Sequence, residues 1–129
     1  MAPLSVTLDR DPRPVGIVTL VGEHDAYSAG RIENELAVLL EAGHCIVIGL
    51  EEATFIDSQT LSVLLAARHQ AERAELGFVL FLPPEPHTQV HRILEMTGLG
   101  LAFPVEQELD RAVAAARAGR ASGEHIRAA

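Results

Sequence analysis

The chain has 129 residues, enough for one domain that closes a single hydrophobic core without a metal ion or a disulfide bond. Its formal net charge of −8 argues against nucleic-acid binding, which needs a concentrated basic face. All ten basic residues are arginine, which excludes lysine chemistry such as a Schiff base or a P-loop. With a single cysteine, Cys45, and no stretch typical of a signal peptide or a membrane span, we expect a soluble cytoplasmic protein.

The N-terminal part predicts two antiparallel strands and a helix. Leu4–Leu8 alternates apolar and polar residues, turn-forming residues follow, and Val15–Val21 is rich in β-branched side chains. Gly22 ends the second strand, and Ser28 is placed to cap a helix that Gly43 ends. Apolar side chains at helical spacing share one face of that helix, namely Ile32, Leu36, Leu39 and Leu40.

The central part predicts a buried strand, a connection, a second helix and another strand. Cys45–Leu50 is continuously apolar, as parallel strands buried on both faces usually are. The connection EEATFID leads to a helix from about Ser58 to Ala74. Gly77 then precedes the apolar strand FVLFL, which the proline-rich segment Pro83–Pro86 ends.

The C-terminal part predicts a third helix that ends before Gly98, a short strand at Leu101–Val105 and a helix from about Glu106 to Arg117. We expect one domain over residues 1–118 and a flexible polar tail over 119–129.

The order β-β-α-β-α-β-α-β-α predicts an α/β fold. Strands that alternate with helices imply a mixed, mostly parallel sheet with right-handed crossovers, about four helices and one antiparallel N-terminal strand.

The segment FIDSQTL raises the question of what Ser58 does. A hydrolase nucleophile elbow needs glycines beside its serine, but Asp57 and Gln59 flank this one, and no glycine-rich phosphate loop occurs. A response-regulator receiver would need a lysine, which the chain lacks. The sequence supplies no recognisable base for Ser58, although a base that is close only in space is not visible in a sequence. An enzyme is therefore the least supported alternative.

Metal binding also receives little support. His87 and His91 are four residues apart and share a helix face, but the chain lacks the HExxH glutamate and an obvious third ligand. The adjacent carboxylates Glu51 and Glu52 do not face each other as a catalytic acid and base must. We therefore expect no metal and no cofactor.

Helix-terminal chemistry accounts better for Ser58. Asp57 or Ser58 is a suitable N-cap, because either side chain accepts hydrogen bonds from free backbone N–H groups. A phosphate on a first-turn serine would meet the positive end of the helix dipole, and its charge of about −2 would fall beside Asp57. The position suits a binding switch.

Two stretches carry a family resemblance. The run CIVIGLEEATFIDSQTLSVLL resembles the strand, loop and phosphoacceptor helix of STAS domains, specifically the bacterial anti-sigma factor antagonists. Their motif, Asp-Ser-Ser/Ala/Thr-Gly-Leu, reads Asp57-Ser58-Gln59-Thr60-Leu61 here, with Gln59 and Thr60 departing from the pattern. A second stretch, Gly22–Ala29, resembles the family's Gly-Glu/Asp-Leu/Ile-Asp segment, and the order of elements agrees from about Leu4 to Ala116.

The resemblance implies a mechanism without catalysis by this chain. An anti-sigma factor with serine-kinase activity would bind the unphosphorylated domain and release a sigma factor. It would then use its own ATP and Mg²⁺ to phosphorylate Ser58, and a serine phosphatase would reverse the modification. An unphosphorylated scaffold or an accessory subunit, in stress signalling or a transporter complex, is the alternative. The implied partner-binding residues are Asp25, Phe55, Asp57, Ser58, Gln59 and Thr60.

Overall fold

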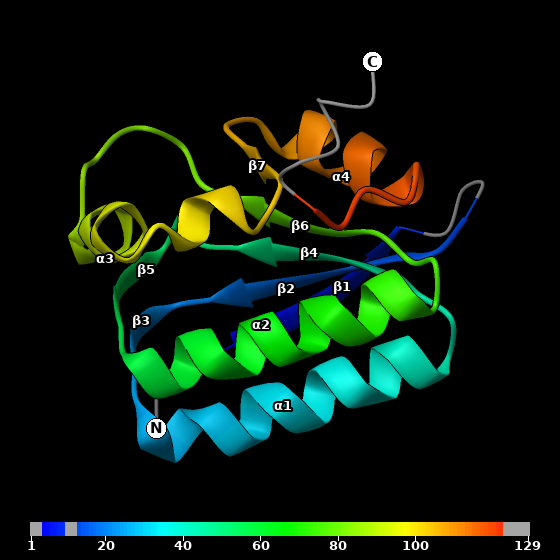
Figure 1. Cartoon of the computed structure of the whole chain (residues 1–129), viewed down its shortest axis with the longest axis horizontal. Helices are drawn as coiled ribbons and strands as arrows, with labels where there is room; N and C mark the ends of the chain where they lie inside the picture. Colours follow the sequence, from blue (N-terminus) through cyan, green and yellow to red (C-terminus); the bar gives the residue numbers. More distant parts are fainter. Residues whose placement is uncertain (1–3, 10–12, 123–129) are drawn as a thin grey trace.

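The computed structural model describes residues 4–9 and 13–122 and contains a five-stranded sheet (Figure 1). Its strands are β1 (Leu4–Asp9), β2 (Val15–Leu20), β4 (Cys45–Gly49), β6 (Phe78–Phe81) and β7 (Val105–Glu106). They lie in the order β1-β2-β4-β6-β7, with β1 antiparallel to β2 and the other neighbours parallel. The predicted mixed α/β sheet with an antiparallel N-terminal strand is confirmed.

Four α-helices and one 3-10 helix occur in the described part of the chain. They are α1 (Ala26–Glu41), α2 (Ser58–Arg73), α3 (Gln89–Thr97), η1 (Leu99–Leu101) and α4 (Leu109–Arg117). Figure 1 shows α1 and α2 side by side on one side of the sheet, α4 on the other, and α3 at one end. None of the helices among these residues is long and apolar enough to cross a membrane.

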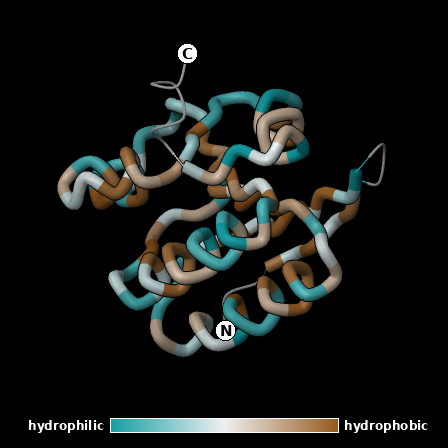
Figure 2. The backbone as a smooth tube through the Cα atoms, turned by 45° about the vertical axis from the view of Figure 1, so that its right-hand side comes forward, coloured by the Kyte–Doolittle hydropathy of each residue, from teal (hydrophilic) through white to brown (hydrophobic). Residues whose placement is uncertain are grey.

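The core lies on both faces of β4, whose five residues are all buried. Gly16 of β2 pairs with Ile46, and a Cβ added at Gly16 would meet Leu39 of α1, so this side of the pleat faces α1. On the opposite side, a Cβ added at Gly77 would meet the backbone of Ala116 in α4. Figure 2 shows the matching pattern, with hydrophobic central strands and helices that alternate between hydrophobic and hydrophilic residues.

A second, two-stranded parallel sheet is present that the sequence does not predict. It consists of β3 (Gly22–His24) and β5 (Ala53–Ile56). The chain bends at Gly22, whose φ of +80° is accessible mainly to glycine, and the register shifts between Gly22 and Glu23. Strands of three and four residues are too short for their alternation to be read from sequence.

The prediction for residues 101–108 is wrong in detail. Leu99–Leu101 is a 3-10 helix, β7 covers only Val105–Glu106, and α4 begins at Leu109 instead of Glu106. Glu106 is held in an extended strand because it pairs with Phe81, and its carboxylate lies 3.1 Å from Arg120 Nη1. These partners are distant in sequence, so local pattern does not reveal them.

The predicted tail, 119–129, lies partly outside the described residues, which end at Ser122. Its first residues pack against the domain. The Arg120 carbonyl accepts a 2.7 Å hydrogen bond from the Phe78 backbone N–H, and Ala121 is buried. Arg68 Nη1 donates to the Ala121 carbonyl over 3.0 Å. Residues up to 122 therefore belong to the packed structure.

Candidate protein-interaction site

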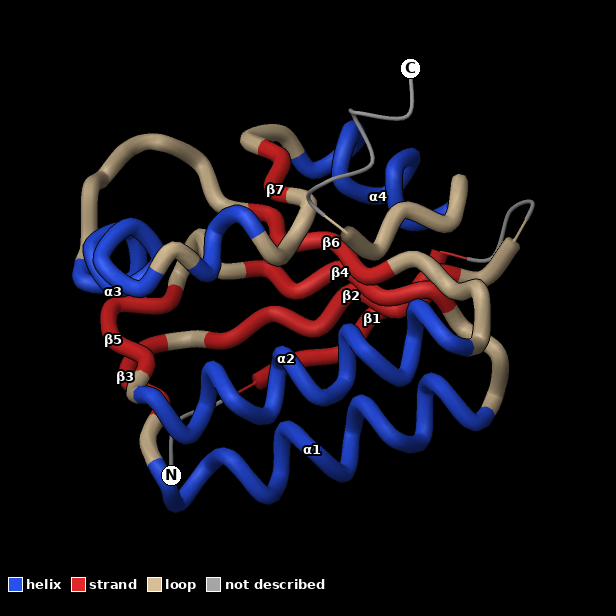
Figure 3. The backbone as a smooth tube through the Cα atoms, viewed as in Figure 1, coloured by secondary structure: helices blue, strands red, loops and turns tan. Residues whose placement is uncertain are grey.

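Two paired strand ends place two helix N-termini next to each other. His24 at the end of β3 pairs with Ile56 at the end of β5. The next residue in each case, Asp25 or Asp57, is the N-cap of a helix, and the Asp57 N–H donates to the His24 carbonyl over 3.2 Å. Figure 3 shows both helices starting at the end of the molecule where β3 and β5 lie.

Asp57 is the N-cap of α2, and Ser58 is the first helical residue. The Asp57 backbone is extended, and its carboxylate Oδ1 accepts a 2.8 Å hydrogen bond from the Thr60 N–H. This settles which of the two predicted candidates caps the helix. The Ser58 side chain is exposed at the first helical position, and Gln59 beside it is also exposed. Ser58 is therefore open to solvent at the start of the helix.

Thr60 occupies the inside of the same turn. Its side chain is fully buried, and its hydroxyl lies 3.3 Å from the His24 carbonyl, to which it donates. Thr60 thus closes the turn from inside the fold, whereas the other predicted contact residues are exposed or half-buried. Ser62 is exposed one turn further along, with its hydroxyl donating to the Ser58 carbonyl over 3.0 Å.

The start of α1 differs from its prediction. Asp25 is the N-cap and accepts a 3.0 Å hydrogen bond from the Tyr27 N–H. Ser28, the predicted cap, is instead buried at the third helical position, where its Oγ lies 3.2 Å from the donating Asp25 N–H. The pair forms a capping box with serine in place of the usual glutamate or glutamine, a variant that is easily missed.

Two aromatic side chains are exposed beside these caps. Phe55 of β5 retains 38% of its surface exposed and pairs in register with Glu23 of β3. Tyr27, in the first turn of α1, is 86% exposed. The sequence analysis named Phe55 as a contact residue but did not name Tyr27. The available signal was that Tyr27 lies two residues after Asp25, a residue type that often caps helices. Exposed aromatic side chains are common anchors of protein interfaces.

His24 makes hydrogen bonds to the starts of both α1 and α2. The imidazole is fully buried, with Nδ1 3.1 Å from Ser28 Oγ and Nε2 3.1 Å from the Val21 carbonyl. Its own carbonyl receives the two bonds from Asp57 and Thr60 described above. The ring is held inside the fold by these contacts, so it is a structural group and is not placed as a general base for Ser58.

Gln89 ties α3 to the strand that precedes Ser58. The Ile56 N–H donates to Gln89 Oε1 over 2.9 Å, and Gln89 Nε2 donates to the Ile56 carbonyl over 3.0 Å. The side-chain amide thus pairs with the backbone as a neighbouring strand would. Sequence analysis missed this residue, because the two partners are 33 positions apart.

The surface around Ser58 is acidic. Glu23, which pairs with Phe55, and Asp25 are exposed, and Asp57 is half-buried. Arg31 is the only basic residue in the sequence from position 14 to position 67. Such a surface favours an electropositive partner. It would gain further negative charge, of about −2, if Ser58 were phosphorylated.

The two histidines of the considered metal pair have other roles. The His91 Nδ1 accepts a 3.0 Å hydrogen bond from the Thr88 N–H, and its Nε2 donates to the Pro83 carbonyl over 2.8 Å. The His87 ring stacks on that of His91 with centroids 4.7 Å apart. Throughout residues 4–9 and 13–122, no group of three or more His, Cys, Asp or Glu is placed to hold a metal ion.

Comparisons with known proteins bear on the fold as a whole. The STAS domain model matches residues 6–112 of the chain. An anti-sigma factor antagonist from Mycobacterium paratuberculosis has 27% sequence identity and a TM-score of 0.69, with 89% of this chain and 95% of that one covered. The comparison with curated proteins finds no match.

The fold is also that of SpoIIAA. The unphosphorylated form of this anti-sigma factor antagonist has 15% identity and a TM-score of 0.63, covering 85% of this chain and 94% of that one. The phosphorylated form of SpoIIAA from Bacillus has 19% identity and a TM-score of 0.61, covering 83% of this chain and 96% of that one.

Proposed function

This chain belongs to the STAS domain family, and on that premise we propose that it acts as an anti-sigma factor antagonist switched at Ser58. The observation that carries the proposal is an exposed serine at the first position of a helix capped by Asp57, within an acidic surface. Similarity over most of the chain to an anti-sigma factor antagonist supports the same function. In its unphosphorylated form the protein binds an anti-sigma factor, and a sigma factor is released.

The proposed binding surface combines both helix starts. It contains the exposed side chains of Asp25, Phe55, Ser58 and Gln59, together with Asp57. Tyr27 extends this surface along α1. The aromatic rings supply apolar contact area, and the carboxylates select a basic partner. Thr60 contributes by holding the turn in place.

Phosphorylation at Ser58 would act through charge rather than through unfolding. The first turn of α2 offers a positive dipole end, so the helix tolerates the phosphate. The segment that carries both helix starts, from position 14 to position 67, contains one arginine, Arg31, and so offers the phosphate no arginine cluster of its own. A partner fitted to the neutral serine would therefore meet a concentrated negative charge and dissociate.

The protein acts in this scheme as a ligand and a substrate, without enzymatic activity of its own. The anti-sigma factor is the serine kinase and supplies ATP and Mg²⁺, and a serine phosphatase restores the hydroxyl. The buried position of His24 supports this assignment, because a serine nucleophile needs a base within reach. We place this exchange in the cytoplasm.

The decisive experiment is mass spectrometry of the protein after incubation with a candidate anti-sigma factor kinase and Mg-ATP. We expect one phosphate, localised to the peptide that contains Ser58 and absent in Ser58→Ala. Ser62→Ala is the matched control, because Ser62 is also exposed on α2, and it should be phosphorylated as the wild type is. Phosphate that persists in Ser58→Ala would place the acceptor elsewhere and contradict the switch.

An unswitched scaffold or accessory subunit is the second candidate. The observation in its favour is Thr60, which stands where the family motif has glycine and bonds to the His24 carbonyl. This contact restricts the turn that a kinase would have to approach. A stable complex with the partner, together with no phosphate on Ser58, would support this candidate over the first.

A further inference from the structure

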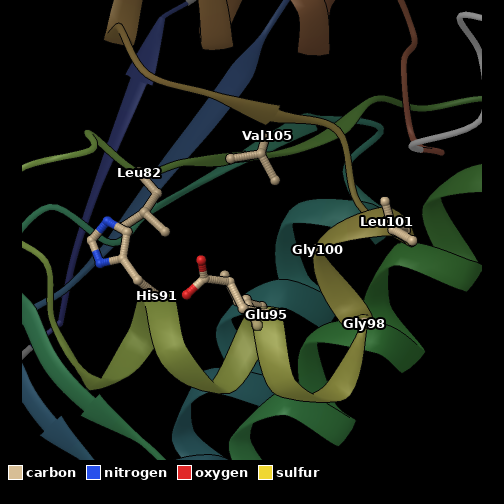
Figure 4. Close-up of a pocket in the computed structure, with 8 residues that line it drawn as sticks. Leu82, His91, Glu95, Gly98, Gly100, Leu101 and Val105 are labelled. Atoms are coloured by element: carbon tan, nitrogen blue, oxygen red, sulfur yellow. The ribbon is translucent and has the colours of Figure 1, made fainter.

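A concave surface lies between α3, η1 and β7, and its lining residues are distinct from those of the proposed binding surface. Its volume is about 410 Å³, within the range of small-molecule sites. Figure 4 shows the cavity bounded by α3 below and by the β7 segment above. The apolar and glycine residues that line it are Leu82, Leu94, Gly98, Gly100, Leu101 and Val105.

Glycines open this cavity. Gly98 ends α3 with a φ of +73°, and a Cβ added there would meet no atom within 4 Å. A Cβ added at Gly100 would come no closer than 3.9 Å to Leu94. The backbone therefore leaves room where larger side chains would fill the space. Leu101 is 79% exposed at the rim, so apolar surface remains accessible to a ligand.

Only one of the two polar residues that line the cavity has hydrogen-bonding capacity to offer a ligand. His91 uses both ring nitrogens within the fold, on Thr88 and Pro83, so its ring serves as a wall. Glu95 turns its carboxylate into the space between α3 and β7 (Figure 4). That carboxylate is 70% exposed, and its Oε1 lies 3.4 Å from His87 Nε2, so its second oxygen can accept from a ligand.

We propose that this cavity binds a small apolar molecule that carries one ammonium group. Leu82, Leu94 and Val105 would bury the apolar body, and the ammonium group would lie at Glu95. An anionic ligand is disfavoured, because the lining contains a carboxylate and no arginine. The proposal does not rest on anti-sigma factor binding, since none of the lining residues belongs to the Ser58 surface.

The test is a titration of the ¹⁵N-labelled protein, followed by two-dimensional NMR, with n-octylamine, octan-1-ol and octanoate at pH 7. The three probes share one chain length and differ in head-group charge. We expect the amine to shift the amide signals of Leu94, Gly98, Gly100 and Leu101 most, and octanoate to bind at least tenfold more weakly. Shortening the amine should lower affinity about three- to fourfold for each methylene removed.

Two variants assign the site. Gly100→Val adds a side chain whose Cβ comes no closer than 3.9 Å to Leu94 and whose methyl groups fill the cavity, so the affinity for n-octylamine should fall at least tenfold. Glu95→Gln should lower that affinity about two- to fivefold, because the carboxylate is largely exposed. The affinity of the Glu95→Gln variant for octan-1-ol should equal that of the wild type. Unperturbed signals from β2 and β4 establish that each variant folds.

Several results would overturn the proposal. These are the absence of localised shifts, equal affinity for octanoate, or binding that Gly100→Val leaves unchanged. Concentration-dependent shifts at the same residues without a probe, abolished by Leu101→Asp, would instead show that a second copy of the chain occupies the groove.

Discussion

The starts of α2 and α4 differ in what fixes them. The α2 helix begins at Ser58, as the sequence predicts, and its N-cap Asp57 bonds to the Thr60 N–H three residues on. The α4 helix begins at Leu109, after an N-cap, Glu108, for which the described structure shows no side-chain capping bond. Its preceding residues are held instead by strand β7, where Glu106 pairs with Phe81.

The difference teaches which boundaries are local. A capping side chain and the helix that it starts are neighbours in sequence, so a short stretch of sequence is enough to favour the boundary. The β7 pairing joins residues 25 positions apart, and it exists only once the sheet has formed. The following substitutions test this contrast, from the largest expected effect to the smallest.

Gly77→Ala should destabilise the protein most, by about 3 kcal/mol or more. The added Cβ would lie 2.6 Å from Ala116 Cα and against its carbonyl oxygen, so α4 would have to leave its position on the sheet. Urea denaturation, monitored by circular dichroism, measures the change in the free energy of unfolding. An undiminished free energy of unfolding would mean that α4 is not held by this close contact.

Ser58→Glu should weaken binding to the anti-sigma factor by about 2 to 3 kcal/mol, or roughly a hundredfold, because it adds charge to an acidic interface. The stability of the fold should not fall, since a carboxylate is favourable in the first turn of a helix. Isothermal titration calorimetry gives the affinity. Ser62→Glu is the control one turn later, and an equal loss there would indicate a general charge effect.

Gln89→Ala should cost about 2 kcal/mol of stability, because it leaves the Ile56 N–H and carbonyl without their partners. This substitution tests whether the Ser58 region, despite its local signals, also depends on α3. Hydrogen exchange at the Ile56 amide should accelerate. Gln107→Ala, at an exposed position, is the matched control. Equal exchange in both variants would contradict a role for the Gln89 bonds.

Asp57→Ala should cost about 1 kcal/mol, the usual value for loss of an N-cap, and Asp57→Asn should cost less because asparagine also caps. Chemical denaturation of both variants measures the difference. If the two variants lose equal stability, the capping bond to the Thr60 N–H is not what fixes the start of α2.

Gly30→Ala should stabilise the protein by about 0.5 to 1 kcal/mol, since glycine is unfavourable inside a helix. Gly30 is exposed in α1, and a Cβ there meets no atom within 4 Å. Gly98→Ala offers equal space at a φ of +73° and should instead destabilise. Thermal unfolding compares the two, and a shift of the same sign in both would contradict the argument from backbone conformation.

Most of the fold and part of the candidate site were predictable. The apolar run of β4, the helical spacing of α2 and the αL glycine Gly98 after α3 are signals within a few residues of their effect. The same holds for Asp57 and Ser58, because caps prefer short polar side chains. The fifth strand of the main sheet exists, but its predicted bounds of 101–105 are wrong, since a 3-10 turn and a two-residue strand have no periodicity of their own.

By itself, the sequence determined the order of the main strands and helices and the position of Ser58 at a helix start, because periodicity and capping act over a few neighbouring residues. Tertiary structure decided that the helix caps Asp25 and Asp57 lie next to each other, that Thr60 is buried and that Gln89 supports Ile56. These features depend on the pairing of β3 with β5 and on the docking of α3. The residues that contact each other in these features are some thirty positions apart in sequence, and they meet only in the folded chain.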